Sequence, residues 1–422
     1  MATPVIFVAG QDPLLGLSGH PSYVRAHARA AVSAGFEPHI FCISHPPGIV
    51  KTDFGLVHRV RLPSLRRLTR TSGIGLRIDL VGVDAPRLAA GIRQFIGSER
   101  GPHLIHGFGQ WGCVGITLRE QMRPAGAEII PVNSVYGSWQ HACAGRVRGL
   151  GNAHSLSQKA FYLAEWLWSR LVVARYEGRA YAESRLVLVN YESVRRLLRD
   201  EFGPGAEVRR LPYAAEAAFL PSRAPSPEPL PVGPLTPRDA PLIVSVSRHD
   251  ARKGVDVLLR ALGQLKAAGI PFRACLVSGG PLLTAHRRLV ERLGLETMVT
   301  LTGWVPDSFA YLQHADVFVL PSLRESSGSL ALLEALQAGV AVVASNVDGI
   351  PEDVTDGESA LLVEPGNVAQ LTGALTRVLT DRELQRRLAE RARTTLAERF
   401  SADAFTAALR NLYAELGFTP QP

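Results

Sequence analysis

The sequence carries, at residues 321–339, the stretch PSLRESSGSLALLEALQAG, and this stretch decides the fold class. It begins where a short apolar, β-branched run ends, which is typical of a buried strand. A polar loop follows and leads into a helix predicted over 329–338, with Ser327 or Ser329 at its N-cap and Gly339 beyond its last residue. A strand, a polar loop and a helix in this order form the repeating unit of parallel sheets.

The same unit recurs along the chain in both directions from this stretch. Strands are predicted at residues 5–10, 38–43, 103–108, 129–135, 185–190, 242–247, 274–279, 298–303, 317–322, 341–345 and 360–365. Helical patterns separate them, such as residues 22–35, where Gly35 is a typical helix stop. The alternation predicts an α/β fold with parallel sheets and crossover helices.

A proline-rich linker divides the chain almost in half. Residues 220–241 contain eight prolines, which exclude a regular helix or a central strand and favour a stiff, extended segment. We therefore expect an N-terminal domain at 1–219, a C-terminal domain at 242–397 and a final helical segment at 398–422 that packs back toward the N-terminal domain. Two doubly wound, Rossmann-like domains facing across a cleft would bind ligands at the carboxyl ends of their strands.

The composition is typical of a soluble globular protein and excludes a largely disordered one. The 422 residues are 46% hydrophobic and 20% charged, with a net charge of +8 and a pI of about 9.6. A basic surplus fits nucleic acid, an anionic membrane surface or a phosphorylated substrate, and charge alone does not choose among them. The richest apolar window, 161–173, is too short to span a bilayer, and the N-terminal apolar run lacks the features of a signal peptide.

The four cysteines are predicted to be buried, reduced thiols of a cytoplasmic protein. Cys42, Cys113, Cys143 and Cys275 lie in apolar or small-residue stretches, and none belongs to a C-x-x-C pair. The sequence has no Asp-x-Asp pair and no His/Cys cluster with metal-ligand spacing. It therefore predicts neither a bound metal nor another cofactor.

The loop after the predicted strand at 242–247 is basic and leads directly into a helix. It reads SRHDARKG and contains Arg248 and Lys253. Free backbone amides at a helix start and cationic side chains on the preceding loop together form an anion site. Arginine offers a planar fork to phosphate oxygens and lysine a point charge. The alternative is two surface cations near a turn.

Two other segments carry candidate ligand groups. The turn Gly279-Gly280-Pro281 follows a strand, and its glycines allow the backbone to approach a ligand closely. Glu334 lies inside the otherwise apolar helix LALLEALQA, where a buried carboxylate would need a partner. It is either aimed at sugar hydroxyls, from which it can accept two hydrogen bonds, or exposed on a polar stripe of the helix.

In order and spacing, these segments resemble the retaining glycosyltransferases of family 4 (glycosyl transferases group 1), which have the GT-B fold. The family pattern is a Gly-Arg-Leu loop followed by Lys-Gly, a Gly-Asp-Gly-Pro turn, a Pro-Ser loop with two glutamates, and an apolar Val-Val-Ala-Ser strand. The matching segments here are Arg248 to Lys253-Gly254, Gly279-Gly280-Pro281, Pro321-Ser322 with Glu325 and Glu334, and AVVASNVDGIPEDV at 341–354. The resemblance is dense from 242 to 365 and looser in the N-terminal half.

The resemblance implies a role for each matching residue. Arg248 and Lys253 would neutralise the donor diphosphate and stabilise the departing nucleotide. Glu325 would contact a hydroxyl of the transferred sugar, and Glu334 would hold the ribose hydroxyls. The other donor contacts would come from Gly19, Gly279, Gly280, Pro281, Gly328, Ser329 and Leu330.

The chain departs from the family pattern in its glutamate spacing and in its glycine turn. Eight residues separate Glu325 from Glu334, where the family has seven, so that Ser326 falls at the usual position of the first glutamate. In the turn, the aspartate of the family pattern is assigned to Gly280. These departures leave open whether Glu325 fills the role of the first glutamate.

A third departure concerns the contact with the sugar or the acceptor. Tyr136 stands where many family members have a histidine; it can donate a hydrogen bond but does not take up a proton near pH 7. His141, five residues further on, is a candidate replacement. His106 matches another family histidine that follows a strand, and a structural histidine is the alternative reading of it.

The resemblance implies a metal-independent, retaining enzyme that moves a hexose-type sugar from a nucleotide sugar to a hydroxyl group. UDP is the first choice of nucleotide and GDP the next, and the acceptor would be a glycan, a lipid-linked saccharide or a small molecule of cell-envelope synthesis. Two alternatives stay open: a protein that binds sugar nucleotides without transfer, and an epimerase of nucleotide sugars.

A basic stretch suggests where such a protein could meet a membrane. Residues 59–77 read RVRLPSLRRLTRTSGIGLR, in which arginines alternate with apolar residues. This surface would suit anionic lipid, so we expect a cytoplasmic protein, with peripheral contact to the inner face of the membrane as one option. The alternative is a solvated basic loop. Nucleic acid is not an expected partner, because no aromatic-and-basic recognition motif is present.

Overall fold

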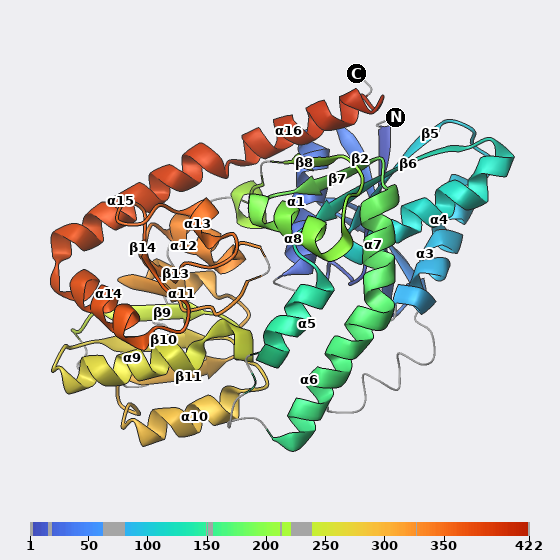
Figure 1. Ribbon diagram of the computed structural model, residues 1–422. Helices are drawn as coiled ribbons and strands as arrows, with labels where there is room; N and C mark the ends of the chain where they lie inside the picture. The colour runs from blue at the N-terminus through green and yellow to red at the C-terminus, as the bar shows by residue number, and fades with distance from the viewer. Residues whose placement is uncertain are drawn as a thin grey trace. The chain divides into compact units, whose positions relative to one another are not determined.

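Two β-sheets made largely of parallel strands organise the chain, as Figure 1 shows. The structure is a computed structural model that describes residues 3–15, 19–61, 81–148, 150, 155–211, 213–220, 239–325 and 327–420. The chain divides into two compact units. Residues 1–143, 164–220 and 400–422 form the first, and residues 144–163 and 221–399 form the second. The predicted α/β class is confirmed.

The sheet of the first unit has the strand order β3-β4-β2-β1-β5-β6-β7-β8, with β3 antiparallel to β4 and the other pairs parallel. Its strands are β1 (Thr3–Ala9), β2 (Phe36–Ser44), β3 (Gly48–Thr52), β4 (Gly55–Arg61), β5 (Pro102–Phe108), β6 (Glu128–Val135), β7 (Leu186–Val189) and β8 (Val208–Arg210). The central strands are buried on both faces, which explains their unbroken apolar runs.

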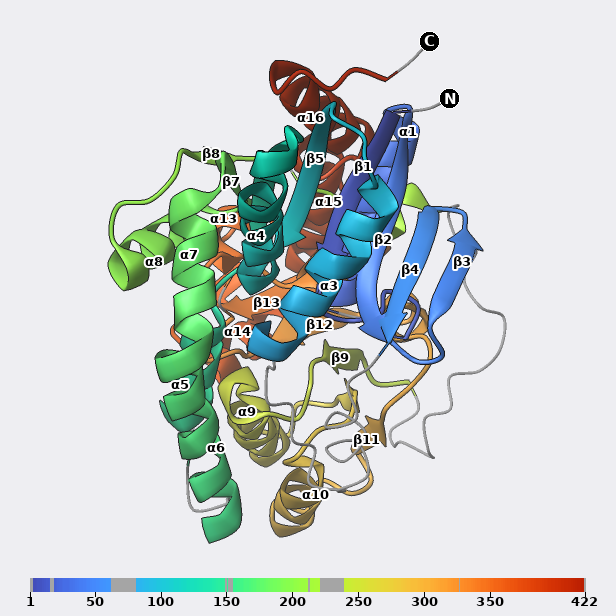
Figure 2. The same ribbon diagram turned by 90° about the vertical axis from the view of Figure 1, so that its right-hand side faces the viewer.

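Helices cover both faces of this sheet. They are α1 (His20–Ser33), α3 (Val81–Ile96), α4 (Cys113–Met122), α7 (Ala174–Glu183), α8 (Glu192–Phe202) and α16 (Ala402–Glu415). Figure 2 shows α3 and α4 side by side on one face. The start of α1 is favoured by Pro21 in its first turn, and its end by Gly35, whose φ of 90° suits glycine.

The sheet of the second unit is parallel throughout, in the order β11-β10-β9-β12-β13-β14. Its strands are β9 (Leu242–Val246), β10 (Arg273–Val277), β11 (Val299–Gly303), β12 (Val317–Leu320), β13 (Ala341–Ser345) and β14 (Leu361–Val363). Its helices are α9 (Val255–Ala267), α10 (Leu283–Arg292), α11 (Phe309–Gln313), α12 (Leu330–Ala338), α13 (Ile350–Asp353), α14 (Val368–Thr380) and α15 (Arg382–Arg399). The strand order reverses between β9 and β12, and ligands of doubly wound sheets bind at such a switch point.

The division into units differs in one respect from the expected boundary at residue 219. Residues 144–163 group with the second unit, where Gly145 lies close to the side chains of Arg252 and Arg324. These residues belong to two helices, α5 (Trp139–Arg148) and α6 (Leu156–Trp168). A π-helical turn, η3 (Ser169–Val173), joins α6 to α7, so that Figure 1 shows α6 and α7 as one continuous helical column. Most of the expected linker, residues 221–238, lies outside the described residues.

Three strands of the first sheet, β3, β4 and β8, are absent from the sequence-based prediction. The hairpin β3–β4 includes Arg59, which the sequence places in a basic surface stretch. Arg59 instead forms an ion pair with the buried Asp12, with Nε 2.8 Å from Oδ2. Arg59 is thus paired within the protein, and residues 62–77 of that stretch lie outside the described residues, so that the membrane contact stays a prediction.

The last helix, α16, belongs to the first unit, together with the rest of residues 400–422. Its Tyr413 is fully buried, and the Tyr413 hydroxyl lies 2.7 Å from His106 Nδ1 on β5. All four cysteines are buried and free, as predicted. None of the described helices combines the length and the apolar character that crossing a bilayer requires.

Candidate functional site

Lys253 lies at the end of a tight basic loop that connects β9 to α9. The loop closes with a 3₁₀ turn, η5 (Ala251–Lys253), in which the Asp250 side chain accepts a hydrogen bond of 3.3 Å from the Arg252 amide. Asp250 thus acts as the N-cap of this turn. The Lys253 side chain is only 12% exposed, so the loop directs the ammonium group into the protein rather than into solvent.

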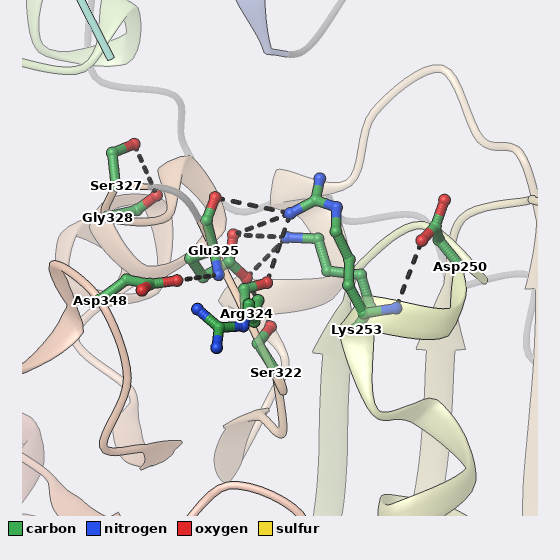
Figure 3. Close-up of polar contacts among 9 residues, drawn as sticks. Asp250, Lys253, Ser322, Arg324, Glu325, Ser327, Gly328 and Asp348 are labelled. Carbon is green, nitrogen blue, oxygen red and sulfur yellow. Dashed lines mark hydrogen bonds and ion pairs between the residues drawn. The ribbon is translucent and has the colours of Figure 1, made fainter. Parts of the chain in front are cut away.

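The ammonium group of Lys253 pairs with Glu325, which lies on the loop after β12. Lys253 Nζ donates to both carboxylate oxygens of Glu325, at 2.6 Å each, as Figure 3 shows. The Ser322 hydroxyl donates to the same carboxylate. Burial lowers the pKa of Lys253, and the Glu325 carboxylate opposes this shift. The two loops that flank the switch point therefore meet in a buried ion pair.

Asp348 forms a hydrogen bond with the backbone of Glu325. Its carboxylate accepts a hydrogen bond of 2.6 Å from the Glu325 amide (Figure 3). Asp348 has a φ of 51°, a left-handed conformation that is uncommon for residues other than glycine. The neighbouring Gly349 amide donates to the Ser327 carbonyl at 3.0 Å, so the loop after β13 fixes the loop after β12 at two points.

Gly254 allows the loops after β9 and β12 to approach each other. Its φ is 62°, and a Cβ at this position would lie 2.1 Å from the Pro321 carbonyl oxygen. The Arg252 carbonyl accepts hydrogen bonds from the amides of Leu323 and Arg324, at 2.8 and 3.1 Å. The glycine of the Lys-Gly pair is therefore required by close backbone packing as well as by its dihedral angle.

Arg248 differs from Lys253 in being exposed. Its guanidinium makes no hydrogen bond or ion pair with any residue that the structure describes. It lies on the same loop, five residues before Lys253, at the carboxyl end of the central strand β9. The charge of Arg248 is therefore unpaired among the described residues, whereas Lys253 already has a partner.

The turn after β10 packs against this loop. The His249 amide donates to the Gly279 carbonyl at 3.0 Å, and a Cβ at Gly280 would lie 2.5 Å from the His249 carbonyl oxygen. When the family turn Gly-Asp-Gly-Pro is aligned on the exposed Pro281, its aspartate falls at Gly279 and its first glycine at Ser278. This alignment corrects the assignment of the aspartate to Gly280. Ser278 indeed has a φ of 115°, which glycine adopts most easily.

The N-terminus of α12 follows the loop after β12. Ser329 is the N-cap residue, and none of the described side chains caps the amides of the first turn, which starts at Leu330. Such amides can bind an anion. Gly328 is buried just before the helix, and Glu334 lies in its second turn, partly exposed. The predicted helix is confirmed, including its stop at Gly339, which has a φ of 68°.

The predicted residues of the first unit lie in different settings. Gly19 is exposed at the N-cap of α1, with a φ of 71°. The Tyr136 ring stacks on Tyr23 with a centroid distance of 3.9 Å, and its hydroxyl lies 3.0 Å from His27 Nε2. Burial raises the pKa of Tyr136 well above its ordinary value.

His106 and His141 differ in their accessibility. His106 has no exposed surface, and its ring nitrogens lie 2.7 Å from Tyr413 Oη and 2.8 Å from Ser134 Oγ, which is the pattern of a structural histidine. Burial lowers its pKa well below the ordinary value. His141 is partly exposed, with Nδ1 3.9 Å from Glu201 Oε1. The roles of both as acceptor contacts stay predictions.

Sequence reasoning missed three residues that build the centre of the site: Ser322, Asp348 and Arg252. Arg252 Nη1 lies 3.8 Å from Glu325 Oε2 and donates to the carbonyls of Arg324 and Glu325. The Asp-Gly pair at 348–349 signals a turn, but its contact with Glu325 spans 23 residues and has no local signature. Ser326, the other candidate for the first glutamate position, lies outside the described residues.

No group of three or more His, Cys, Asp or Glu residues in the described part of the chain is arranged to hold a metal ion. The groups that lie at the switch point include the cations Arg248 and Lys253 and the backbone amides at the start of α12. Such a set binds an anion, and a diphosphate in particular suits the combination of an arginine, a lysine and a helix N-terminus.

Comparison with known proteins defines the class of fold and of domain. The chain has the GT-B fold: it superposes on sucrose-phosphate synthase from Thermosynechococcus elongatus with a TM-score of 0.72 at 21% identity, over 98% of this chain and 99% of that one. It also superposes on HepE from Anabaena, solved in complex with UDP-glucose, with a TM-score of 0.67 at 15% identity, over 98% and 99%. Residues 226–395 match the family model "Glycosyl transferases group 1".

Two of the curated relatives are glycosyltransferases by name. A lipopolysaccharide core biosynthesis glycosyltransferase, LpsE of Rhizobium meliloti, is 33% identical over 179 residues, which are 42% of this chain and 51% of that protein. A GDP-mannose-dependent phosphatidylinositol monomannoside mannosyltransferase of Mycolicibacterium smegmatis is 32% identical over 227 residues, 51% of this chain and 58% of that protein. The chain thus spans about half the length of the curated relatives it matches.

Proposed function

We propose that the protein is a retaining glycosyltransferase of family 4, which transfers a hexose-type sugar from a nucleotide sugar to an acceptor hydroxyl. The observation that carries the proposal is the loop after β9 at the switch point of the second sheet, which holds an exposed Arg248 and a Lys253 that is paired with Glu325. These residues fall within the segment 226–395 that matches the glycosyltransferase family model. The segment that matches the family model therefore contains the loops that hold Arg248, Lys253 and Glu325.

In the proposed mechanism the donor diphosphate lies against Arg248, Lys253 and the free amides at the start of α12. The bond between the anomeric carbon and the diphosphate breaks, and the cations stabilise the charge that develops on the leaving group. The acceptor hydroxyl oxygen forms the new bond on the same face of the sugar, and its proton passes to a phosphate oxygen. Glu325 would orient the sugar hydroxyls, and Glu334 would accept hydrogen bonds from the ribose. Transfer would need no metal ion, because protein cations bind the diphosphate.

We propose UDP as the first choice of nucleotide and GDP as the second. UDP is supported by HepE, whose structure holds UDP-glucose, and GDP by the mannosyltransferase named as GDP-mannose-dependent. The acceptor would be a glycan or a lipid-linked saccharide of the cell envelope, in line with the names of both curated relatives. The enzyme would act at the cytoplasmic side of the membrane, where nucleotide sugars are made.

Thermal unfolding with UDP-glucose, GDP-mannose, ADP-glucose and dTDP-glucose tests the donor site. A ligand at about a hundred times its Kd stabilises the folded state by about 2.7 kcal/mol. One nucleotide sugar should stabilise the wild type, and Arg248→Ala should lose most of this effect. Arg248 is the sharper variant, because it is exposed and has no partner among the described residues, so its removal should hardly change the stability of the free protein.

The same samples separate the proposal from its alternatives. Release of nucleotide together with a glycosylated acceptor supports transfer. Stabilisation without turnover, for any envelope-type acceptor offered, would point to a protein that only binds sugar nucleotides. Conversion of the donor sugar to its epimer without an acceptor would point to an epimerase. No stabilisation by any of the four donors would contradict the diphosphate site.

A further inference from the structure

The helical column made of α6 and the π-helical turn η3, residues 156–173, distributes its polar and apolar side chains in an unusual way. The side chains that it buries include Glu165 and Ser169, which are 5% and 0% exposed. The exposed ones include four leucines: Leu156 at 85%, Leu163 at 46%, Leu167 at 43% and Leu171 at 60%. A surface helix normally turns its charged face to water and its leucines inward. Here the acid is covered and the leucines are exposed.

The exposed leucines form one continuous stripe. They follow one another at intervals of seven, four and four residues, and helical residues three, four and seven apart share a face. Trp168, which is 37% exposed, extends the stripe near its C-terminal end. We call these five residues (Leu156, Leu163, Leu167, Trp168 and Leu171) the leucine stripe. Contiguous apolar surface of this kind marks a site of interaction with a partner or a membrane.

Cations flank the leucine stripe and exposed acids do not. Lys159, Arg170 and Arg175 lie along the same helical column, and the Arg170 guanidinium also lies 5.7 Å from the Trp166 ring centroid. The sole acidic residue between 155 and 176 is the buried Glu165. The exposed face therefore combines apolar side chains with positive charge, and it includes an exposed tryptophan, which favours the boundary between lipid headgroups and acyl chains.

We propose that the leucine stripe binds the surface of an anionic lipid bilayer, with α6 lying in the plane of the interface. The leucines and Trp168 would enter the acyl boundary, while Lys159, Arg170 and Arg175 would contact lipid phosphates. A second copy of the chain is disfavoured as the occupant, because a two-fold pairing of this face would bring like charges together without opposing acids. The proposal does not depend on the donor chemistry, since it concerns a different surface.

The experiment is co-sedimentation of the full chain with vesicles. One set is phosphatidylcholine alone, and the other is phosphatidylcholine and phosphatidylglycerol in equal parts. The wild type should bind the mixed vesicles and should bind neutral ones at least about tenfold more weakly, since each cation near an anionic surface strengthens binding several-fold. Added salt should weaken binding to the mixed vesicles, because it screens exposed charges.

Two variants test the residues, and a matched variant controls for loss of exposed apolar surface. Leu163→Asn/Leu167→Asn/Leu171→Asn should reduce binding to mixed vesicles by about a hundredfold, because three apolar side chains no longer enter the acyl boundary. Lys159→Glu/Arg170→Glu/Arg175→Glu should reduce it at least about tenfold. The control Val32→Asn/Ile49→Asn removes exposed apolar side chains on α1 and β3, 41% and 66% exposed, and should bind as the wild type does. Far-UV circular dichroism checks that every variant is folded.

Several results would overturn the proposal. One is equal binding by the wild type and the triple leucine variant, and another is failure of the wild type to bind mixed vesicles at all. A third is a dimer, measured by sedimentation velocity, that dissociates in the triple leucine variant; this would assign the stripe to a second copy of the chain. Donor binding measured by thermal unfolding is a separate readout. A lost vesicle interaction with intact donor binding therefore rejects this inference alone.

Discussion

Lys253 and Glu325 form a buried ion pair in which the lysine Nζ lies 2.6 Å from each carboxylate oxygen, although the two residues are 72 positions apart in the chain. Their side chains are only 12% and 4% exposed. The lysine that is proposed to bind the donor diphosphate is thus already satisfied by a carboxylate. Donor binding would give Lys253 a second anionic partner, so the two negative groups would share one cation.

This pairing predicts that Lys253→Met loses stability as well as donor binding. Removal of one partner leaves the Glu325 carboxylate buried without its counter-charge, which costs about 3 kcal/mol. The double variant Lys253→Met/Glu325→Gln should recover most of the stability and none of the donor binding. Urea unfolding and thermal shift measure the two properties separately; an additive loss in the double variant would contradict the pairing.

Gly254→Ala should be far more damaging than a substitution at an equivalent glycine elsewhere. Its Cβ would meet the Pro321 carbonyl oxygen at 2.1 Å, so the two loops of the site would have to separate. We expect a loss of about 3 kcal/mol, from the clash together with the left-handed φ. Gly269→Ala is the matched control, because Gly269 has a φ of 71° and none of the described residues places an atom within 4 Å of the point where its Cβ would stand.

The control should cost only about 1 kcal/mol, the penalty of a left-handed conformation without a clash. Urea unfolding of both variants gives the comparison. Equal losses would mean that Gly254 is required for its dihedral angle and not for the approach of the two loops.

Stability should fall as the pH falls from about 6.5 to 4. Burial lowers the pKa of His20, His27, His58 and His249 to about 4, from 6.5 in the unfolded chain. In this window the unfolded chain binds protons that the folded protein does not, so unfolding becomes more favourable with each added proton. The contribution is complete above about pH 6.5 and is lost progressively toward pH 4, at about 1.4 kcal/mol per pH unit for each histidine.

Urea unfolding across this window, together with proton uptake measured during unfolding, checks the pH dependence. His249→Asn should reduce the slope, because one of the four groups no longer takes part. Its partner His286, whose Nδ1 lies 2.8 Å from His249 Nδ1, stays in place in that variant. A slope unchanged by His249→Asn would show that this histidine does not contribute.

Tyr413→Phe should destabilise the first unit by roughly 1–3 kcal/mol, because it leaves His106 Nδ1 buried without its partner. Tyr311→Phe is a matched control: the Tyr311 hydroxyl is buried, and none of the described residues forms a hydrogen bond with it. That substitution should be neutral or slightly stabilising. Chemical denaturation of both variants measures the difference. If Tyr413→Phe leaves the free energy of unfolding unchanged, the hydrogen bond does not stabilise the first unit.

The sequence predicts the parallel strands well because they are buried on both faces, which makes each of them an unbroken apolar run such as AVVAS at β13. It fails at the β3–β4 hairpin, where charged residues such as Lys51 and Arg59 interrupt the pattern. Arg59 pairs with Asp12, which is 47 positions earlier, and no local pattern reports such a contact.

The candidate site, too, could be predicted only in part from the sequence. Glycines and cations of the β9 loop follow from motif and spacing, but the position of Glu325 does not. The extra residue between Glu325 and Glu334 leaves open whether Glu325 reaches the centre of the site. Its place is set by Ser322, Asp348 and Lys253, which come from three different loops. The inverted polarity of α6 is equally hidden, because periodicity gives the apolar face of a helix and not which face is covered.

The return of the last helix to the first unit has a consequence for the order in which the chain is synthesised. His106 on β5 has its partner in Tyr413, which leaves the ribosome 307 residues later. All of residues 221–399, most of the second unit, emerge in between. The first unit therefore cannot finish folding before α16 has been synthesised, and its interior between α1 and α16 stays open until then. During that interval the nascent protein would depend on chaperones, and a chain that stops after residue 399 would keep this interior exposed.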